Sequence, residues 1–164
     1  MIGHEANFVA ARENTGINAG QGNVWKANEI EVQDGKEYLV RLYAHNNGLN
    51  GTEDMARDVK LQFDVPTVSA ESIAVHGVIY CSNSEHAWYS DGVKFVADQP
   101  FHLEYQTGRT LFENNGIGSR GGAILSDEIV GDGTYIGFSS LDGNLPGCYE
   151  YSCYTTITVK VVYD

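Results

Sequence analysis

The chain has 164 residues and a formal net charge of -12 at pH 7. This acidic balance argues against nucleic acid and anionic membrane surfaces as partners, because neutralising phosphates requires clustered Lys and Arg. Nineteen glycines and ten tyrosines, together with many Val, Ile and Thr, indicate an antiparallel β protein with many turns. The length suits one domain, residues 1–164, with a substantial core.

Targeting signals are absent from the sequence as given. No run approaches the roughly 18 apolar residues that a membrane span needs. The start, MIGHEANF, has neither the basic flank nor the apolar stretch of a signal peptide. If the parent protein is exported, we expect the chain to be a piece of it, with Met1 added.

The first elements are a short strand at residues 7–11 and a glycine-rich loop at residues 13–22. Apolar and polar residues then alternate over residues 29–33 and again over residues 38–44. The Asp-Gly pair at residues 34–35 between them is a strong two-residue turn signal. The sequence therefore predicts a β-hairpin over this region.

Four more strands follow in the middle of the chain. Alternation predicts strands at residues 58–66, which Pro66 ends, and at residues 72–81. After a polar loop, two further strands are predicted at residues 93–97 and 101–108.

The pattern weakens beyond residue 108. Residues 123–130 predict a single helical turn or an irregular segment, and residues 133–138 predict a short strand. From residue 151 onward, odd-numbered apolar residues alternate with mostly polar ones, which makes the last strand the clearest in the sequence. The whole pattern predicts an all-β fold, a two-sheet antiparallel β-sandwich of immunoglobulin-like or jelly-roll-like type with 8–10 short strands.

The three cysteines allow at most one disulfide within the chain. Cys81 and Cys153 both fall on the apolar side of their strands, so both are expected to point into the core, where a bridge between them can form. Cys148 lies in the turn after Pro146-Gly147. A bridge from Cys148 to either of the others, and three reduced cysteines, are the alternatives.

Motifs for catalysis are weak. The glycines at positions 116, 118 and 121 satisfy the G-x-G-x-x-G spacing, but no helix follows them, so a turn is the better interpretation. The five histidines show no metal-ligand spacing, and no G-x-S-x-G sequence is present. We therefore expect a protein that is not an enzyme and requires no cofactor.

Calcium is the candidate metal, because two loops offer the hard oxygen ligands that Ca²⁺ prefers. One loop carries Asn47, Glu53 and Asp54, and the other carries Asp127 and Asp132. Neither loop matches the twelve-residue calcium-binding pattern, and Asp-Gly pairs are first of all turn formers.

Aromatic residues at positions 86–89 are the candidate ligand-binding group. His86, Trp88 and Tyr89 are expected on a loop, where a sugar ring or another protein can rest on their rings. The alternative is that Trp88 folds back over the edge of the sandwich.

The run FHLEY, followed by LFENNGIGSRGGAILSDEIV and GFSSLDGNLPGCYEYSCYTTITVKVVYD, together with NFVAARE, DGKEYLVRLYAHNN and VKLQFDVP, resembles an uncharacterised β-sandwich domain of large bacterial surface proteins. In those proteins the domain precedes conserved-repeat, immunoglobulin-like stalk domains. The resemblance implies an extracellular, wall-attached or secreted setting and no known catalysis. The family pattern has a cysteine matching Cys148 but not ones matching Cys81 and Cys153, which fits a bridge between these two.

These observations together predict a non-enzymatic structural or adhesive module of a bacterial surface or secreted protein. The alternative is a carbohydrate- or peptide-binding module that uses the loop aromatics, with calcium. The expected partners are an extracellular protein or glycan and neighbouring domains of the parent protein. An exposed edge strand that pairs with another copy is a further route to assembly.

Overall fold

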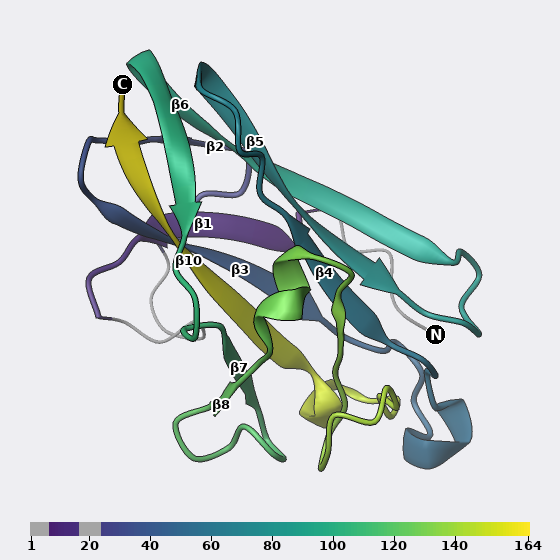
Figure 1. Ribbon diagram of the computed structural model, residues 1–164. Coiled ribbons are helices and arrows are strands. Elements are labelled where there is room, and N and C mark those ends of the chain that lie inside the picture. Colours follow the sequence, from purple (N-terminus) through teal and green to yellow (C-terminus); the bar gives the residue numbers. More distant parts are fainter. Residues whose placement is uncertain (1–6, 17–23) are drawn as a thin grey trace.

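The computed structural model describes residues 7–16 and 24–164, which fold almost entirely into strands (Figure 1). The strands are β1 (Val9–Glu13), β2 (Glu29–Glu31), β3 (Glu37–Ala44), β4 (Lys60–Asp64), β5 (Ala70–Tyr80), β6 (Trp88–Tyr105), β7 (Leu111–Asn114), β8 (Ala123–Ile124), β9 (Thr134–Tyr135) and β10 (Cys153–Tyr163). Three short 3-10 helices complete the described part: η1 (Gly51–Asp54), η2 (Asp127–Val130) and η3 (Tyr149–Tyr151). The predicted all-β class is confirmed.

The strands form one continuous hydrogen-bonded path in the order β1-β3-β10-β6-β5-β4-β9. β7 pairs with β10 and carries β8 at its side, and β2 pairs with β6. Every pairing is antiparallel except that between β2 and β6, which is parallel. The predicted division into two separate sheets is not confirmed, because β6 connects both halves of the path.

β6 joins the two halves by changing partner along its length. Sequence predicted two strands here, but the structure has one, the long teal ribbon of Figure 1. Ser72 of β5 pairs with Val96 and Ala70 pairs with Phe101, so residues 97–100 bulge out of the ladder. A bulge of this kind bends a strand. Beyond it, Phe101 and the residues that follow pair with β10.

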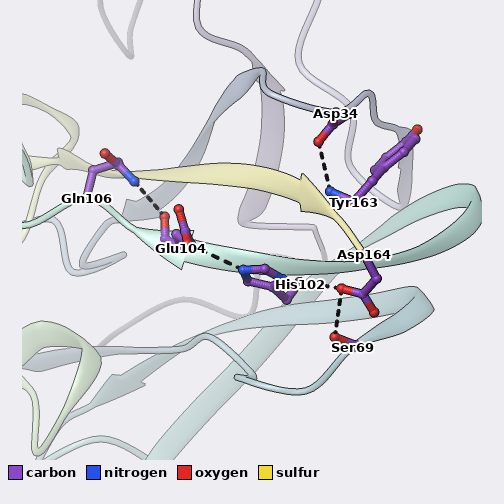
Figure 2. Close-up of polar contacts among 7 residues, drawn as sticks. All are labelled: Asp34, Ser69, His102, Glu104, Gln106, Tyr163 and Asp164. Carbon is purple, nitrogen blue, oxygen red and sulfur yellow. Dashed lines mark hydrogen bonds and ion pairs between the residues drawn. The ribbon is translucent and has the colours of Figure 1, made fainter.

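The predicted hairpin around the Asp34-Gly35 turn is wrong, because β2 pairs with β6 and not with β3. The turn itself forms, with Gly35 at a φ of 78°. β3 is already paired on both edges, by β1 and β10. β10 also takes the hydrogen bonds at the turn, since Gly35 N donates to Val161 O at 2.8 Å. Tyr163 N likewise donates to Asp34 Oδ1 at 2.8 Å, the contact that Figure 2 shows.

β10 is buried on both faces. The predicted inward residues Ile157, Val159 and Val161 are fully buried, as expected from their alternation. Thr156 and Thr158, which point to the opposite face, are only 4% and 3% exposed. Alternation in the sequence indicates one buried face and gives no sign that the second is covered as well.

The β1-β3 end of the path packs face to face against β5, although these strands are not neighbours in the ladder. A Cβ atom added to Gly77 of β5 would lie 2.7 Å from Leu42 Cδ1 of β3 and 2.8 Å from Val9 Cγ2 of β1. Val9 N also donates to Asp91 Oδ2 of β6 at 2.9 Å. Glycine at position 77 therefore sets how closely the two ends of the path approach.

The predicted disulfide between Cys81 and Cys153 does not form. All three cysteines are free, and none lies at disulfide distance from another. Cys81 and Cys153 are both buried in the core, as their alternation predicted. Their thiols have different partners, because Cys153 Sγ donates to Ala44 O at 3.7 Å and Cys81 Sγ donates to Asn83 Oδ1 at 3.3 Å. Burial raises the pKa of Cys153 to about 12, so this thiol stays protonated at neutral pH.

A forked ion pair fixes the start of β3. Arg109 Nη1 and Nη2 donate to the two carboxylate oxygens of Glu37 at 2.9 and 2.8 Å. Asn14 Nδ2 donates to the same carboxylate at 3.2 Å. The hydrogen bonds from Arg109 lower the pKa of Glu37 below its ordinary value. The pair thereby connects the segment after β6, which carries Arg109, to β3. β6 and β3 lie on opposite sides of β10.

Replacing Gly77 with alanine should destabilise the fold by about 1–3 kcal/mol, because the new methyl group meets Leu42 and Val9 in a packed interior. Urea denaturation followed by tryptophan fluorescence measures the change. The control is Gly92→Ala of β6, which pairs with His76, the neighbour of Gly77, and whose closest contact is the exposed His76 ring, which can turn away. Equal stability of the two variants would contradict the close approach at Gly77.

The Glu37 pair should contribute stability that is present at neutral pH and lost in acid. The pKa of Glu37 is lower in the folded chain than in the unfolded one, so stability falls as the pH drops below about 4.3 and through the folded value. We expect Glu37→Gln to lose less free energy of unfolding than the wild type between neutral pH and about pH 3. Glu71→Gln, at an exposed position, is the control and should keep the wild-type slope.

Candidate functional site

Four side chains from four neighbouring strands form a line across one face of the sheet. Trp88 of β6 pairs with Tyr80 of β5, which pairs with Lys60 of β4, which pairs with Tyr135 of β9. Directly paired residues place their side chains on the same face, with Cβ atoms roughly 4.5–5.5 Å apart. We call Trp88, Tyr80, Lys60 and Tyr135 the aromatic row.

The aromatic row points away from the core. Its neighbours along the strands, Ile79 and Leu61, are buried in the core at 2% and 0% exposure, and successive residues of a strand point to opposite faces. Trp88 and Tyr135 are 58% and 49% exposed. The two ends of the row therefore present large apolar rings to solvent.

The middle of the aromatic row is held in place by its neighbours. Lys60 Nζ lies 5.2 Å from the centre of the Tyr80 ring, a cation–π contact. Tyr80 OH donates to Gln62 Oε1 at 2.9 Å, and Gln62 Nε2 donates to Gly131 O at 2.7 Å. These contacts fix the Tyr80 ring before any ligand arrives, which lowers the entropy lost on binding.

The structure separates the residues of the predicted aromatic loop. Trp88 joins the aromatic row and does not fold back over the edge, since it stays 58% exposed. Tyr89 points to the other side of β6 and packs against the core, with its hydroxyl 2.7 Å from Ser84 Oγ. The His86 ring packs edge-on against Tyr89, with ring centres 5.7 Å apart. Of the three, only Trp88 belongs to the aromatic row, although His86 is exposed as well.

Nothing in the sequence indicates that Tyr80, Lys60 and Tyr135 lie beside Trp88. Each lies at an outward position of its own strand, which alternation indicates for Tyr80 and Lys60. Their alignment depends on the register between β4, β5, β6 and β9, which the strand sequences do not contain.

A second group of aromatic side chains occupies the outer face of β3 and β10. The Arg41 guanidinium lies 4.6 Å from the centre of the Trp25 ring and 5.1 Å from that of Tyr154. Tyr154 and Tyr43 have ring centres 5.1 Å apart. Burial lowers the pKa of Arg41. These rings are already covered by Arg41 and by each other, which makes them a poorer surface for a ligand than the aromatic row.

The predicted calcium residues lie in two loops whose central carboxylates accept backbone hydrogen bonds. Asp54 Oδ2 accepts from the backbone N–H groups of Leu49 and Asn50, both at 3.0 Å. Asn47 and Glu53 lie in the same loop. In residues 7–16 and 24–164 no group of three or more His, Cys, Asp or Glu side chains is arranged to hold a metal ion.

The second predicted calcium loop includes η2. Asp127 Oδ1 accepts from Gly108 N at 2.9 Å and from Tyr105 OH at 2.8 Å. The hydrogen bond from Gly108 N is the main reason that the pKa of Asp127 is lowered. Asp132 follows in the turn after η2. Both Asp54 and Asp127 therefore have a structural role that needs no metal, and calcium binding stays a prediction.

The glycine pattern at positions 116–121 is a turn, as the sequence predicted. Asn114 Oδ1 accepts from Gly116 N at 3.0 Å and from Gly118 N at 2.8 Å. An asparagine side chain that bonds the backbone in this way stabilises a turn. The amide groups that a phosphate would need are thus already bonded to Asn114.

Comparison of the chain with protein-family models, with curated proteins and with solved structures gives no match. A search of the described residues for a helix able to cross a bilayer likewise finds none.

We expect Asp54→Ala to lower the free energy of unfolding by about 1–2 kcal/mol, because the N–H groups of Leu49 and Asn50 lose their acceptor. The matched control is Thr52→Ala, an exposed neighbour in the same loop that is not a predicted calcium ligand, which should be neutral. Thermal unfolding with calcium chloride or with a chelator measures both variants. A melting temperature that rises with calcium in the wild type, and not in Asp54→Ala, would show instead that Asp54 binds the ion.

Proposed function

We propose that the chain is a non-enzymatic adhesive module of a bacterial surface or secreted protein, and that it binds an extended glycan along the aromatic row. The space at Gly77, which Leu42 and Val9 leave too small for an added Cβ atom, supports a description of the fold as two facing layers, a sandwich closed by β6. On that description the aromatic row lies on the outer surface of one layer, accessible to a large ligand.

The observation that carries this proposal is the exposure of two large rings at the ends of a line across four strands. Trp88 and Tyr135 are 58% and 49% exposed, and three strand spacings separate them, roughly 14 Å. A distance of that order suits an oligosaccharide better than a single sugar. The apolar faces of sugar rings pack on aromatic rings, whose polar atoms can hydrogen-bond at the edge.

The polar groups around the aromatic row fit the same ligand class. Ser90, Val78 and Gln62 pair in the next line across β6, β5 and β4, so a hydroxyl and an amide border the rings. Glycan binding commonly combines ring stacking with hydrogen bonds from neutral polar groups, since sugars carry many hydroxyls and few charges. The row itself carries a single charge, on Lys60.

An extracellular setting is part of the proposal. It is supported by the resemblance of the sequence to modules of exported bacterial surface proteins, and by the location of polysaccharides at and beyond the cell surface. In such a protein the neighbouring domains of the same chain would present the aromatic row to its ligand.

We expect Trp88→Ala and Tyr135→Ala each to weaken glycan binding roughly tenfold, equivalent to about 1.4 kcal/mol, because each removes one stacking surface. A glycan array identifies the ligand, and calorimetry with that oligosaccharide measures the affinity. Tyr149→Ala is the matched control, because Tyr149 is 71% exposed but lies outside the row.

Three outcomes would contradict the proposed function. The first is a wild type that binds no glycan on the array, which would favour a purely structural module. The second is a Tyr149→Ala variant that binds as weakly as the two row variants. The third is conversion of the glycan into a product by the purified chain, which would make it an enzyme.

A further inference from the structure

A cavity of about 660 Å³ opens at the bulge of β6, away from the aromatic row at the Trp88 end of the strand. It lies between β2, the bulge of β6, the end of β10 and the start of β3, and we call it the end cavity. Its lining combines apolar, aromatic and acidic side chains with one base, chiefly Ile30, Val96, Tyr38, Glu31, Asp98 and Lys36. Its size falls within the range of small-molecule binding sites, about 300–1,000 Å³.

The walls of the end cavity are fixed by hydrogen bonds between elements far apart in the sequence. Tyr163 OH donates to Val32 O at 3.0 Å, and Tyr163 N donates to Asp34 Oδ1 at 2.8 Å, as Figure 2 shows for the second contact. Gln33 N donates to Tyr38 OH at 2.9 Å. Both tyrosine rings thus have a defined position on the wall, and the cavity is formed without a ligand.

The charges of the end cavity are unbalanced. Among its lining residues are three acids, Glu13, Glu31 and Asp98, and one base, Lys36, so the formal charge of the lining is 1 − 3 = −2. Lys36 Nζ pairs with Glu13 at 2.9 Å. Glu31 and Asp98, both exposed, form no ion pair within the described residues. Two carboxylates at the rim are therefore available to a cation.

We propose that the end cavity binds a small organic cation, an ammonium or amidinium group attached to an apolar body. The cationic group pairs with Glu31 and Asp98 at the rim, where charge-assisted hydrogen bonds are strongest. The apolar body packs on Ile30 and Val96, and the partly exposed ring of Tyr163 favours a nearby positive charge. The net charge of the chain, −12, also raises the local concentration of cations.

This site is independent of glycan binding. The aromatic row uses the Trp88 end of β6 and rings that lie across β4, β5 and β9. The end cavity uses the bulge of β6, β2 and β10. Loss of one activity leaves the other unchanged, so the two proposals fail separately.

The test is an NMR titration of the whole chain, labelled with ¹⁵N, with benzamidine and separately with benzamide. The two probes match in shape and differ in charge. We expect benzamidine to shift the amide signals of residues 30–36, residues 96–98 and Tyr163, and benzamide to shift them at concentrations roughly tenfold higher. Signals around Trp88 should stay in place.

A pair of double variants isolates the rim carboxylates. Glu31→Gln with Asp98→Asn should weaken benzamidine binding roughly tenfold. Glu29→Gln with Asp64→Asn removes the same amount of charge from exposed positions outside the lining, and should leave binding within twofold. All four positions are at the surface, so both double variants should fold.

The proposal is overturned if benzamidine causes no shifts in the end cavity up to its solubility limit. It is equally overturned if benzamide binds as well as benzamidine. A third contradicting result is equal weakening in both double variants, which would mean that only the overall charge of the chain attracts the probe.

Discussion

The backbone hydrogen bonds of β10 hold this fold together. One edge of β10 pairs with β3, and the other edge pairs first with β7 and then with β6. β10 is paired along both edges and buried on both faces. If it detached, β3 on one side and β6 and β7 on the other would lose their backbone hydrogen-bond partners. The Asp34-Gly35 turn and the parallel pairing of β2 with β6 both follow from this arrangement, because β10 takes the edge of β3 that a hairpin partner would need.

The inner face of the sheet forms the core, and the outer face is in contact with solvent. Alternate residues of β4, β5 and β6 fill the core with Leu61, Ile79 and Phe95, which are nearly or fully buried. The residues between them are free to carry function, since their substitution leaves the core intact. That division explains how a row of solvent-exposed rings can be tolerated: the stability of the strands comes from the opposite side.

Local features of the fold were predictable from sequence, and long-range ones were not. The final strand, the inward direction of Cys81 and Cys153, and the turn at Asp34-Gly35 follow from alternation and turn chemistry. Which strands pair depends on all the strand edges that are available in the folded chain. The predicted pairing of β2 with β3 was therefore wrong, and the continuity of β6 through its bulge was not predicted. Trp88 was found as an aromatic in a polar region, whereas Tyr80, Lys60 and Tyr135 join it only through cross-strand register. The predicted disulfide was wrong for a related reason, because two cysteines that point into the same core need not lie side by side.

β6 runs without interruption from Trp88 to Tyr105, and its continuity has a mechanical meaning. A paired strand resists stretching, because many hydrogen bonds would have to shear together for it to lengthen. Tension applied at the Trp88 end of β6 would pass along its hydrogen-bonded ladder to the bulge at residues 97–100, beside which β10 ends. A domain built in this way carries load between these two points through a single element.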